Sequence, residues 1–135
     1  METFLVFLFM GLVLLLSLIP PVTETLLKKD TLKQSSWAHG LKNDELKKEK
    51  SLLEESITSL SKREYRRYLA CFVEYNKRFR PFNWWKANAD TLSDEELEKA
   101  YKKYFRYLSL IDFQDSVCEA ICRFLREQLQ KRSMK

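Results

Sequence analysis

The sequence predicts an all-α fold: a small antiparallel helical bundle of three to four helices behind an N-terminal hydrophobic signal or anchor helix. The 135 residues contain only two glycines and three prolines, whereas an all-β chain needs Gly or Pro at many of its turns. Nine Phe, six Tyr and three Trp are far more aromatic residues than a disordered chain carries. Two Ser-x-x-Glu capping boxes precede apolar residues at helical spacing and mark helix starts.

Residues 1–25 are predicted to be a signal peptide or a signal-anchor. Residues 4–19 carry no charge, and Pro20 and Pro21 end any helix there because a proline ring removes an amide donor and clashes with the preceding turn. As a helix, these residues would extend about 24 Å, which is less than the roughly 30 Å hydrocarbon core of a bilayer. The run is at the long end for the apolar part of a signal peptide.

The sequence leaves two topologies open. Cleavage after Thr25, with Thr23 as the other small residue of the site, would release a lumenal or secreted chain. An uncleaved segment would instead anchor the chain, with the C-terminal body in the cytosol. This second topology is favoured by Lys28, Lys29 and Lys33, because positive charges next to a membrane segment stay on the cytosolic side.

The next two segments are predicted to lie outside the bundle. Residues 26–42 are predicted to be a linker, because a Ser-Ser pair and Gly40 interrupt them. Residues 43–60 are predicted to be a helix or stalk that Asn43 caps. Two heptads are too few to indicate a coiled coil, although the apolar positions have that spacing: Leu46, Leu53, Ile57 and Leu60.

Residues 61–132 are predicted to form the helical bundle domain. Ser61 and Glu64 begin its first helix with a capping box, and Ser93 and Glu96 begin the next in the same way. Three amphipathic helices with short connections are typical of a bundle. Their apolar stripes are Tyr65, Tyr68, Leu69, Phe72, Tyr75 and Phe79; Leu97, Ala100, Tyr101, Tyr104, Phe105 and Leu108; and Val117, Ile121, Phe124, Leu125 and Leu129.

Two further residues set the limits of these helices. Pro81 ends the first helix, because the residue before a proline avoids the α region. Asp112 is the predicted cap of the last helix, since an Asp side chain can accept a hydrogen bond from the free amides of a helix start.

Cys71, Cys118 and Cys122 are the disulfide candidates. Cys118 and Cys122 lie one turn apart on one face of the last helix. In an oxidising compartment, Cys71 is predicted to bridge to one of them, closing a loop of about 50 residues that is worth about 4 kcal/mol. The remaining thiol would then be open to a disulfide-linked dimer. In a reducing compartment, all three would be small buried hydrophobes.

The sequence predicts no catalytic, cofactor or metal site, and therefore no enzyme. His39 is the only histidine, and no hydrolase or metalloprotease motif is present. His39 and the three cysteines would supply a Cys₃His set. Zinc sites, however, usually place paired ligands on a tight turn, whereas Cys118 and Cys122 have C-x₃-C spacing on a helix.

Residues 61–88 account for all of the net charge of +5, because their eight basic residues and two acidic residues, Glu64 and Glu74, sum to +6 while the rest of the chain nearly cancels. The end of this region, residues 80–86, interleaves cations with aromatic rings. Trp, Tyr and Arg are over-represented at binding hot spots, so this region is the candidate interaction surface. The predicted partner-binding residues are Arg63, Arg67, Arg80, Trp84 and Trp85.

The sequence therefore predicts a non-enzymatic helical protein of the secretory pathway that binds a protein partner through a basic aromatic surface. One alternative is a single-pass membrane-anchored adaptor with a cytosolic body. Another is a module that binds an anionic membrane surface, because Lys and Arg are attracted to anionic lipid. Nucleic acid is the least favoured partner, since no nucleic-acid-binding motif fits. No cofactor is expected.

Overall fold

The computed structural model describes residues 3, 5–10 and 22–134. These residues contain helices and no strand, which confirms the predicted all-α class. Residues 3 and 5–10 are helical. The elements after them are α2 (Val22–His39), α3 (Asn43–Glu55), the 3₁₀ helix η1 (Ile57–Ser59), α4 (Lys62–Phe79), α5 (Phe82–Asn88), the 3₁₀ helix η2 (Ala89–Thr91), α6 (Asp94–Leu110) and α7 (Ser116–Ser133).

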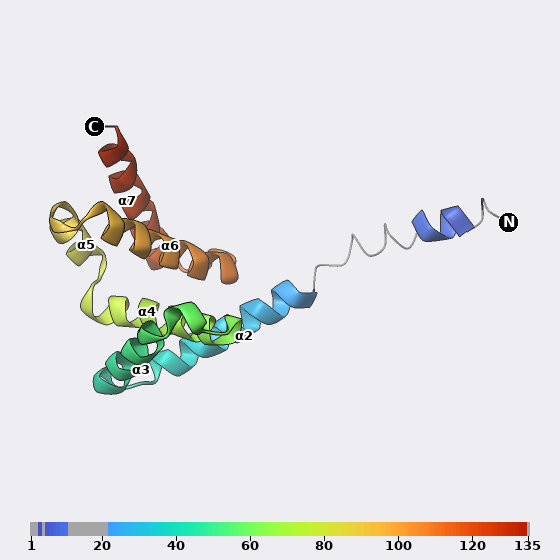
Figure 1. Cartoon of the computed structure of the whole chain (residues 1–135), viewed down its shortest axis with the longest axis horizontal. Coiled ribbons are helices and arrows are strands. Elements are labelled where there is room, and N and C mark those ends of the chain that lie inside the picture. Colours follow the sequence, from blue (N-terminus) through green and yellow to red (C-terminus); the bar gives the residue numbers. More distant parts are fainter. Residues whose placement is uncertain (1–2, 4, 11–21, 135) are drawn as a thin grey trace.

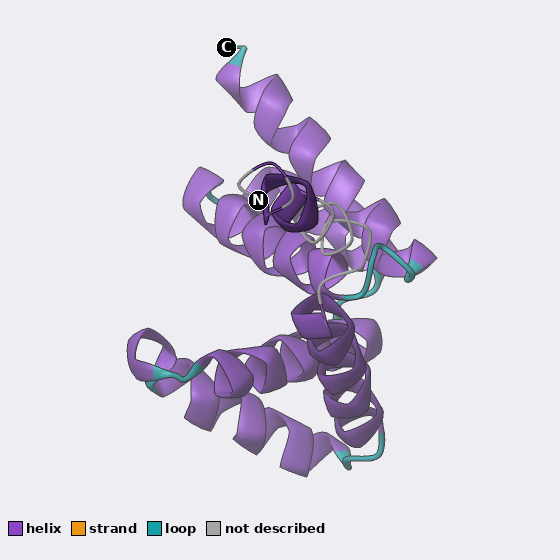
Figure 2. Ribbon diagram, turned by 90° about the vertical axis from the view of Figure 1, so that its right-hand side faces the viewer, coloured by secondary structure: helices purple, strands orange, loops and turns teal. Residues whose placement is uncertain are grey.

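The helices form two tiers (Figure 1). The lower tier holds α2, α3 and α4, and the upper tier holds α5, α6 and α7, as the labels of Figure 1 show; the two tiers are also seen apart in Figure 2. α4 is the central element, because it packs against α2 and α3 within its own tier and against α6 across the tiers. The predicted number of three to four helices is too small, since α2 and α5 occupy segments that the sequence predicts to be a linker and a loop.

The predicted linker, residues 26–42, is mostly helix. α2 spans most of it and packs on α4, with Thr31 and Ala38 fully buried. The buried hydroxyl of Thr31 donates to the carbonyl of Leu27 at 2.7 Å, so it is satisfied within the helix. α2 lacks an apolar stripe, and small and polar side chains form its buried face. Hydrophobic periodicity therefore does not predict this helix.

Residues 43–60 fold as a helix followed by a short 3₁₀ turn, and they do not project as a stalk. α3 packs along α4, and Leu46 is fully buried between them. The predicted cap residue, Asn43, is instead the first residue of α3. Its Oδ1 accepts a hydrogen bond from Arg78 Nη1 at 3.1 Å, which ties the start of α3 to the end of α4.

Side-chain caps begin the three long helices after residue 60. Ser61 forms the complete capping box with Glu64 at the start of α4, and Ser93 accepts the expected amide at the start of α6. The predicted cap of α7 at Asp112 is wrong, because Asp115 caps this helix. Asp112 lies in the preceding turn with a φ of 55°, and its carboxylate pairs with Lys28 of α2 at 3.1 Å.

Two hydrophobic clusters hold the tiers. The larger cluster joins α4, α5, α6 and α7 through residues that include Tyr68, Phe72, Trp85, Tyr104 and Leu108. The smaller cluster lies within the lower tier and consists of Ala38, Leu46, Ala70 and Cys71. α4 contributes to both, which makes it the helix on which the two tiers are assembled.

The predicted signal or anchor segment, residues 1–25, lies largely outside the described residues. Residues 5–10 are helical, and their apolar side chains are exposed. Among the residues that the structure does describe, no helix combines the length and the apolar character needed to cross a membrane.

Candidate functional site

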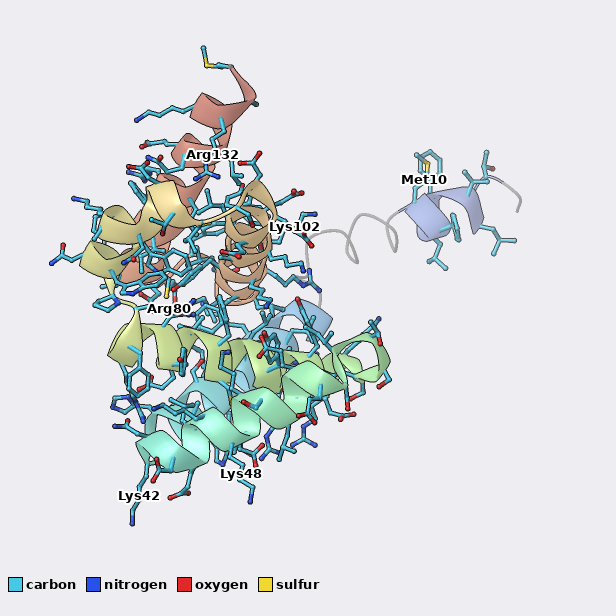
Figure 3. All side chains as sticks on the ribbon, turned by 60° about the vertical axis from the view of Figure 1, so that its left-hand side comes forward. Met10, Lys42, Lys48, Arg80, Lys102 and Arg132 are labelled. Carbon is cyan, nitrogen blue, oxygen red and sulfur yellow. The ribbon has the colours of Figure 1, made fainter. Side chains whose placement is uncertain are left out.

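A cleft of about 410 Å³ opens between the two tiers. One wall comes from α3 and α4, and the other from α5, α6 and Leu92 between them. We call it the α4–α6 cleft. Four cations line it, Lys50, Arg80, Lys99 and Lys103, against the two carboxylates Glu54 and Glu96. The cleft is therefore positively charged, and it contains the part of the predicted interaction surface that lies around Arg80 (Figure 3).

Arg80 and Trp84 form a stacked pair in this cleft. Arg80 is the C-cap residue of α4, and Pro81, which follows it, is the N-cap residue of α5. The Trp84 amide donates to the Pro81 carbonyl at 2.9 Å. This turn brings the guanidinium carbon of Arg80 to 4.5 Å from the Trp84 ring centroid, a cation–π contact. Trp84 is half-buried, and Arg80 is exposed. Within the described residues, no carboxylate lies at salt-bridge distance from Arg80.

Trp85 belongs to the core, although the sequence predicts it to be a partner-binding residue. It is only 3% exposed, and its ring packs edge-on against Tyr104 and against Trp84. Its Nε1 is buried and has no hydrogen-bond partner among the described atoms. Trp85 therefore supports Trp84 from behind, and Trp84 is the more exposed of the two indoles that line the cleft.

Arg63 and Arg67 do not share this surface. They precede Arg80 by 17 and 13 residues on α4, which places them about 20–25 Å away along the helix. The guanidinium carbon of Arg67 lies 4.0 Å from the ring centroid of Trp37 in α2. Arg63 has a side chain that is 73% exposed, and its Nε forms a long ion pair, at 3.9 Å, with Oδ1 of Asp30. The predicted basic aromatic surface is thus two separate regions, at opposite ends of α4.

A polar network that the sequence does not predict lines part of the cleft, with Lys50, Glu54 and Lys103 among the lining residues. The fully buried Tyr68 donates to Glu54 Oε1 at 2.9 Å, and Lys103 Nζ donates to Tyr68 Oη at 2.8 Å. Lys50 also donates to Glu54, at 3.3 Å. The network joins α3, α4 and α6, so its members lie far apart in the sequence and no local motif predicts it. The one sequence signal is Lys50, a charge at an otherwise apolar heptad position.

The pKa values in this network follow from burial and pairing. Burial raises the pKa of Tyr68, and the Glu54 acceptor raises it further. Burial lowers the pKa of Lys103, the nearby charges of Lys50 and Lys99 add to this, and Glu54 opposes it. Burial alone would raise the pKa of Glu54, but its hydrogen bonds from Tyr68 and Lys50 and the lysine charges outweigh this and lower it. Each group has a partner in the network, so the arrangement fixes the cleft wall.

The predicted disulfide is absent, and all three cysteines are unbonded and buried. Cys71 belongs to the smaller cluster, whereas Cys118 and Cys122 belong to the larger one, so the thiols pack against different helices. Burial, with a smaller effect of Glu49, raises the pKa of Cys71 to about 11. Burial also raises the pKa of Cys118 and of Cys122. Protonated buried thiols are poor nucleophiles and poor metal ligands.

The Cys₃His set does not assemble. His39 is the last residue of α2, and its Nδ1 lies 3.2 Å from Oε1 of Glu74 in α4. Arg78 donates to the same carboxylate oxygen at 2.9 Å. Across residues 3, 5–10 and 22–134, no three or more His, Cys, Asp or Glu side chains gather in a way that would hold a metal ion.

Comparison with known proteins adds no relative. No protein-family model matches the chain, and no curated protein or solved structure is significantly similar to it. The α4–α6 cleft, defined by the chain's own geometry, is therefore the candidate functional site.

Proposed function

We propose that this chain is a non-enzymatic helical protein of the secretory pathway that binds a protein partner through the α4–α6 cleft. The observation that carries the proposal is the Arg80–Trp84 pair, in which a half-buried indole and an exposed guanidinium without a carboxylate partner meet in an open cleft. Such Trp and Arg side chains, held rigidly by the residues behind them, supply much of the affinity at protein interfaces.

The cleft specifies the chemistry of the partner. Its four cations exceed its two carboxylates, and complementary potentials favour a partner segment that carries Asp or Glu. The Trp84 ring favours an apolar side chain next to those acids, because burying apolar area adds affinity. We therefore propose an acidic segment with at least one large apolar residue as the bound element.

Site-specific photo-crosslinking tests this proposal. A benzoylphenylalanine is placed at Leu92, which lines the cleft, and in a second chain at Val117, which is 52% exposed on α7. In cells that make the protein, we expect a discrete crosslinked product from position 92. The matched chain with the probe at position 117 should give none. Equal products from both positions would contradict a role for the cleft.

Two variants identify the binding groups. Arg80→Glu and Trp84→Ala are each expected to reduce the crosslinked product at position 92 at least tenfold, because they remove the charge and the ring of the stacked pair. Lys42→Glu reverses an exposed charge on the far side of the lower tier, and should leave the product unchanged. A product that survives Arg80→Glu would refute the proposal. Trp85 is not used, because its loss would disturb the core.

The compartment and topology are also proposals. We propose that residues 4–19 route the chain to the secretory pathway, where it is secreted or held as a single-pass membrane protein; the alternative is an anchored chain with its body in the cytosol. Intact masses of the protein from animal cells distinguish a secreted chain from an anchored one, since cleavage before Leu26 indicates secretion and an intact N-terminus indicates an anchor. We expect three free thiols in either case, because the buried, unbonded cysteines give no support to a disulfide-linked dimer.

A further inference from the structure

A second hollow, of about 310 Å³, lies at the opposite end of α4 from Arg80. α2, α4, α6 and the segment that enters α4 surround it. Its floor is apolar and consists of Leu27, Leu60, Tyr65 and Leu110, all partly buried. Three cations stand at its rim: Lys62, Arg66 and Arg106. We call it the α2–α6 hollow.

Two of the rim cations have no carboxylate partner within the part of the chain that the structure describes. Arg66 is paired with Asp30 at 2.7 Å, whereas Lys62 and Arg106 are exposed and form no ion pair there. Glu64, the nearest acid on α4, accepts the Ser61 amide in the capping box. The N-terminus of α4 and the C-terminus of α6 meet at this end, and their dipoles oppose each other. The two free cations therefore determine the sign of the rim.

The hollow lies close to the point where the chain emerges from its apolar N-terminal run. α2 begins at Val22, directly after Pro20 and Pro21. Leu27, in the wall of the hollow, follows Val22 by five residues, or about 7.5 Å along the helix. Its neighbour Leu26 is 59% exposed. If residues 4–19 enter a bilayer, this end of the body faces the membrane surface.

We propose that the α2–α6 hollow binds an anionic phospholipid of the bilayer from which the chain emerges. The head group would accept hydrogen bonds from Lys62 and Arg106, since charge-assisted bonds to phosphate are among the strongest that side chains form. One acyl chain would lie on the apolar floor. This inference rests on the anchored outcome of the routing proposed above, in which residues 4–19 stay uncleaved in the membrane. It also gives the body an orientation, because the α4–α6 cleft, about 25 Å away along α4, would then point away from the lipid.

Photo-crosslinking lipids test the inference on the full chain. The protein is reconstituted in nanodiscs of phosphatidylcholine alone or with 30% phosphatidylserine, each containing a trace of the same lipid with a diazirine in its acyl chain. Mass spectrometry then maps the labelled residues. In the nanodiscs that contain phosphatidylserine, we expect labels on the floor of the hollow: Leu27, Leu60, Tyr65 or Leu110. Their yield should be several times that found in nanodiscs of phosphatidylcholine alone. Equal labelling in both discs, or no label on these residues, would overturn the inference.

A pair of matched double variants isolates the rim charges. Lys62→Gln with Arg106→Gln should lower labelling of the hollow about 30-fold in serine-lipid discs, from the usual effect of two basic residues at an anionic surface. Lys42→Gln with Lys48→Gln removes the same charge from exposed positions on the far side of the lower tier (Figure 3), and should change it less than twofold. Similar losses in the two variants, with circular dichroism showing both folded, would overturn the inference.

Partner binding in the α4–α6 cleft and lipid binding in the α2–α6 hollow can be refuted independently of each other. Arg80→Glu is expected to leave lipid labelling of the hollow unchanged, and the Lys62→Gln, Arg106→Gln variant is expected to leave the partner crosslink at Leu92 unchanged. Competition by soluble glycerophosphoserine at millimolar concentration should not remove the lipid label. If it does, the hollow is a site for a free anion, and the assignment of a bilayer lipid is overturned.

Discussion

The larger hydrophobic cluster joins α4 to the upper tier through aromatic rings and long aliphatic side chains, whereas the smaller cluster joins α4 to α2 and α3 through short ones. In the larger, rings such as Phe72 and Tyr104 pack edge-on at 5.2 Å. In the smaller, the buried side chains are Ala38, Ala70, Cys71 and one leucine, Leu46, and the larger side chains packed against them, such as Trp37, are only partly buried. Each buried aromatic ring removes about 150–250 Å² from water, so the larger cluster supplies most of the hydrophobic stabilisation.

Polar contacts compensate for this difference in the lower tier. Arg78 of α4 donates to Glu74, to Asn43 of α3 and to the backbone carbonyls of Ala38 and His39 at the end of α2. One guanidinium therefore ties together the three helices of the tier. The comparison shows that the protein assembles one tier by burial of apolar surface and the other by directed hydrogen bonds around a small apolar centre.

Two buried leucines give the largest expected effect and the most direct test of this difference. Leu108 of the larger cluster and Leu46 of the smaller are both fully buried. Leu108→Ala is expected to lower the free energy of unfolding by about 4 kcal/mol and Leu46→Ala by about 2 kcal/mol, since the cost of a cavity depends on how far its walls can collapse. Urea unfolding followed by circular dichroism measures both. A loss at Leu46 as large as that at Leu108 would show that the clusters are equivalent.

Arg78→Ala is expected to come next in size, with a loss of about 2 kcal/mol, because it removes several charge-assisted hydrogen bonds of the lower tier. Arg78→Lys should recover only a small part of this, since an ammonium lacks the planar fork of the guanidinium. Arg123→Ala, which removes an exposed pair with Glu119 on α7, is the control and should cost less than about 0.5 kcal/mol. A loss no larger for Arg78→Ala than for the control would mean that packing alone holds the lower tier.

The smallest effect concerns the contact between Lys77 of α4 and Asp115 of α7. Burial alone would raise the pKa of Asp115, but the Lys77 hydrogen bond and the Cys118 amide outweigh it, so the pKa is lowered. A carboxyl whose pKa is lower in the folded state stabilises the fold above its unfolded pKa of about 4, and this stabilisation is lost as pH falls through the folded value.

Asp115→Asn is therefore expected to cost about 1 kcal/mol at pH 6 and less at about pH 2.5, because the stabilisation by Asp115 declines as its carboxyl becomes protonated. Unfolding by urea at the two pH values measures the difference. Asp90→Asn, at an exposed carboxylate, is the control and should cost less than about 0.5 kcal/mol. A cost that is the same at both pH values would show that Asp115 acts only as the neutral cap of α7.

The elements that the sequence predicts correctly are those with a local signal, either an apolar stripe at helical spacing or a helix cap. α4, α6 and α7 have apolar stripes at helical spacing, and Ser61 and Ser93 cap the first two. α2 is missed because its buried positions are small or polar, such as Thr31 and Ala38. α5 is missed because Pro81 reads as the end of one helix, although it also caps the next.

The same limit applies to the site. Arg80 and Trp84 are predicted to share a surface because residues 80–86 interleave cations with aromatic rings, and the structure stacks the two side chains. Arg63 and Arg67 are assigned to the same surface because a count of charges contains no distances along the helix. The Glu54–Tyr68–Lys103 network depends on three helices meeting, and no pattern within one segment reports such a meeting.

The positions of the three cysteines give the unmodified protein its own reporters of partial unfolding. Cys71 is buried in the smaller cluster, and Cys118 and Cys122 are buried in the larger. Cys71 and Cys118 are at most 1% exposed, so a thiol reagent can reach them only when their surroundings open, and the rate of modification of each of these sulfurs measures the opening of one tier. If hydrogen bonds hold the lower tier more loosely than rings hold the upper one, Cys71 reacts first, and native-state thiol exchange separates the two tiers without any substitution.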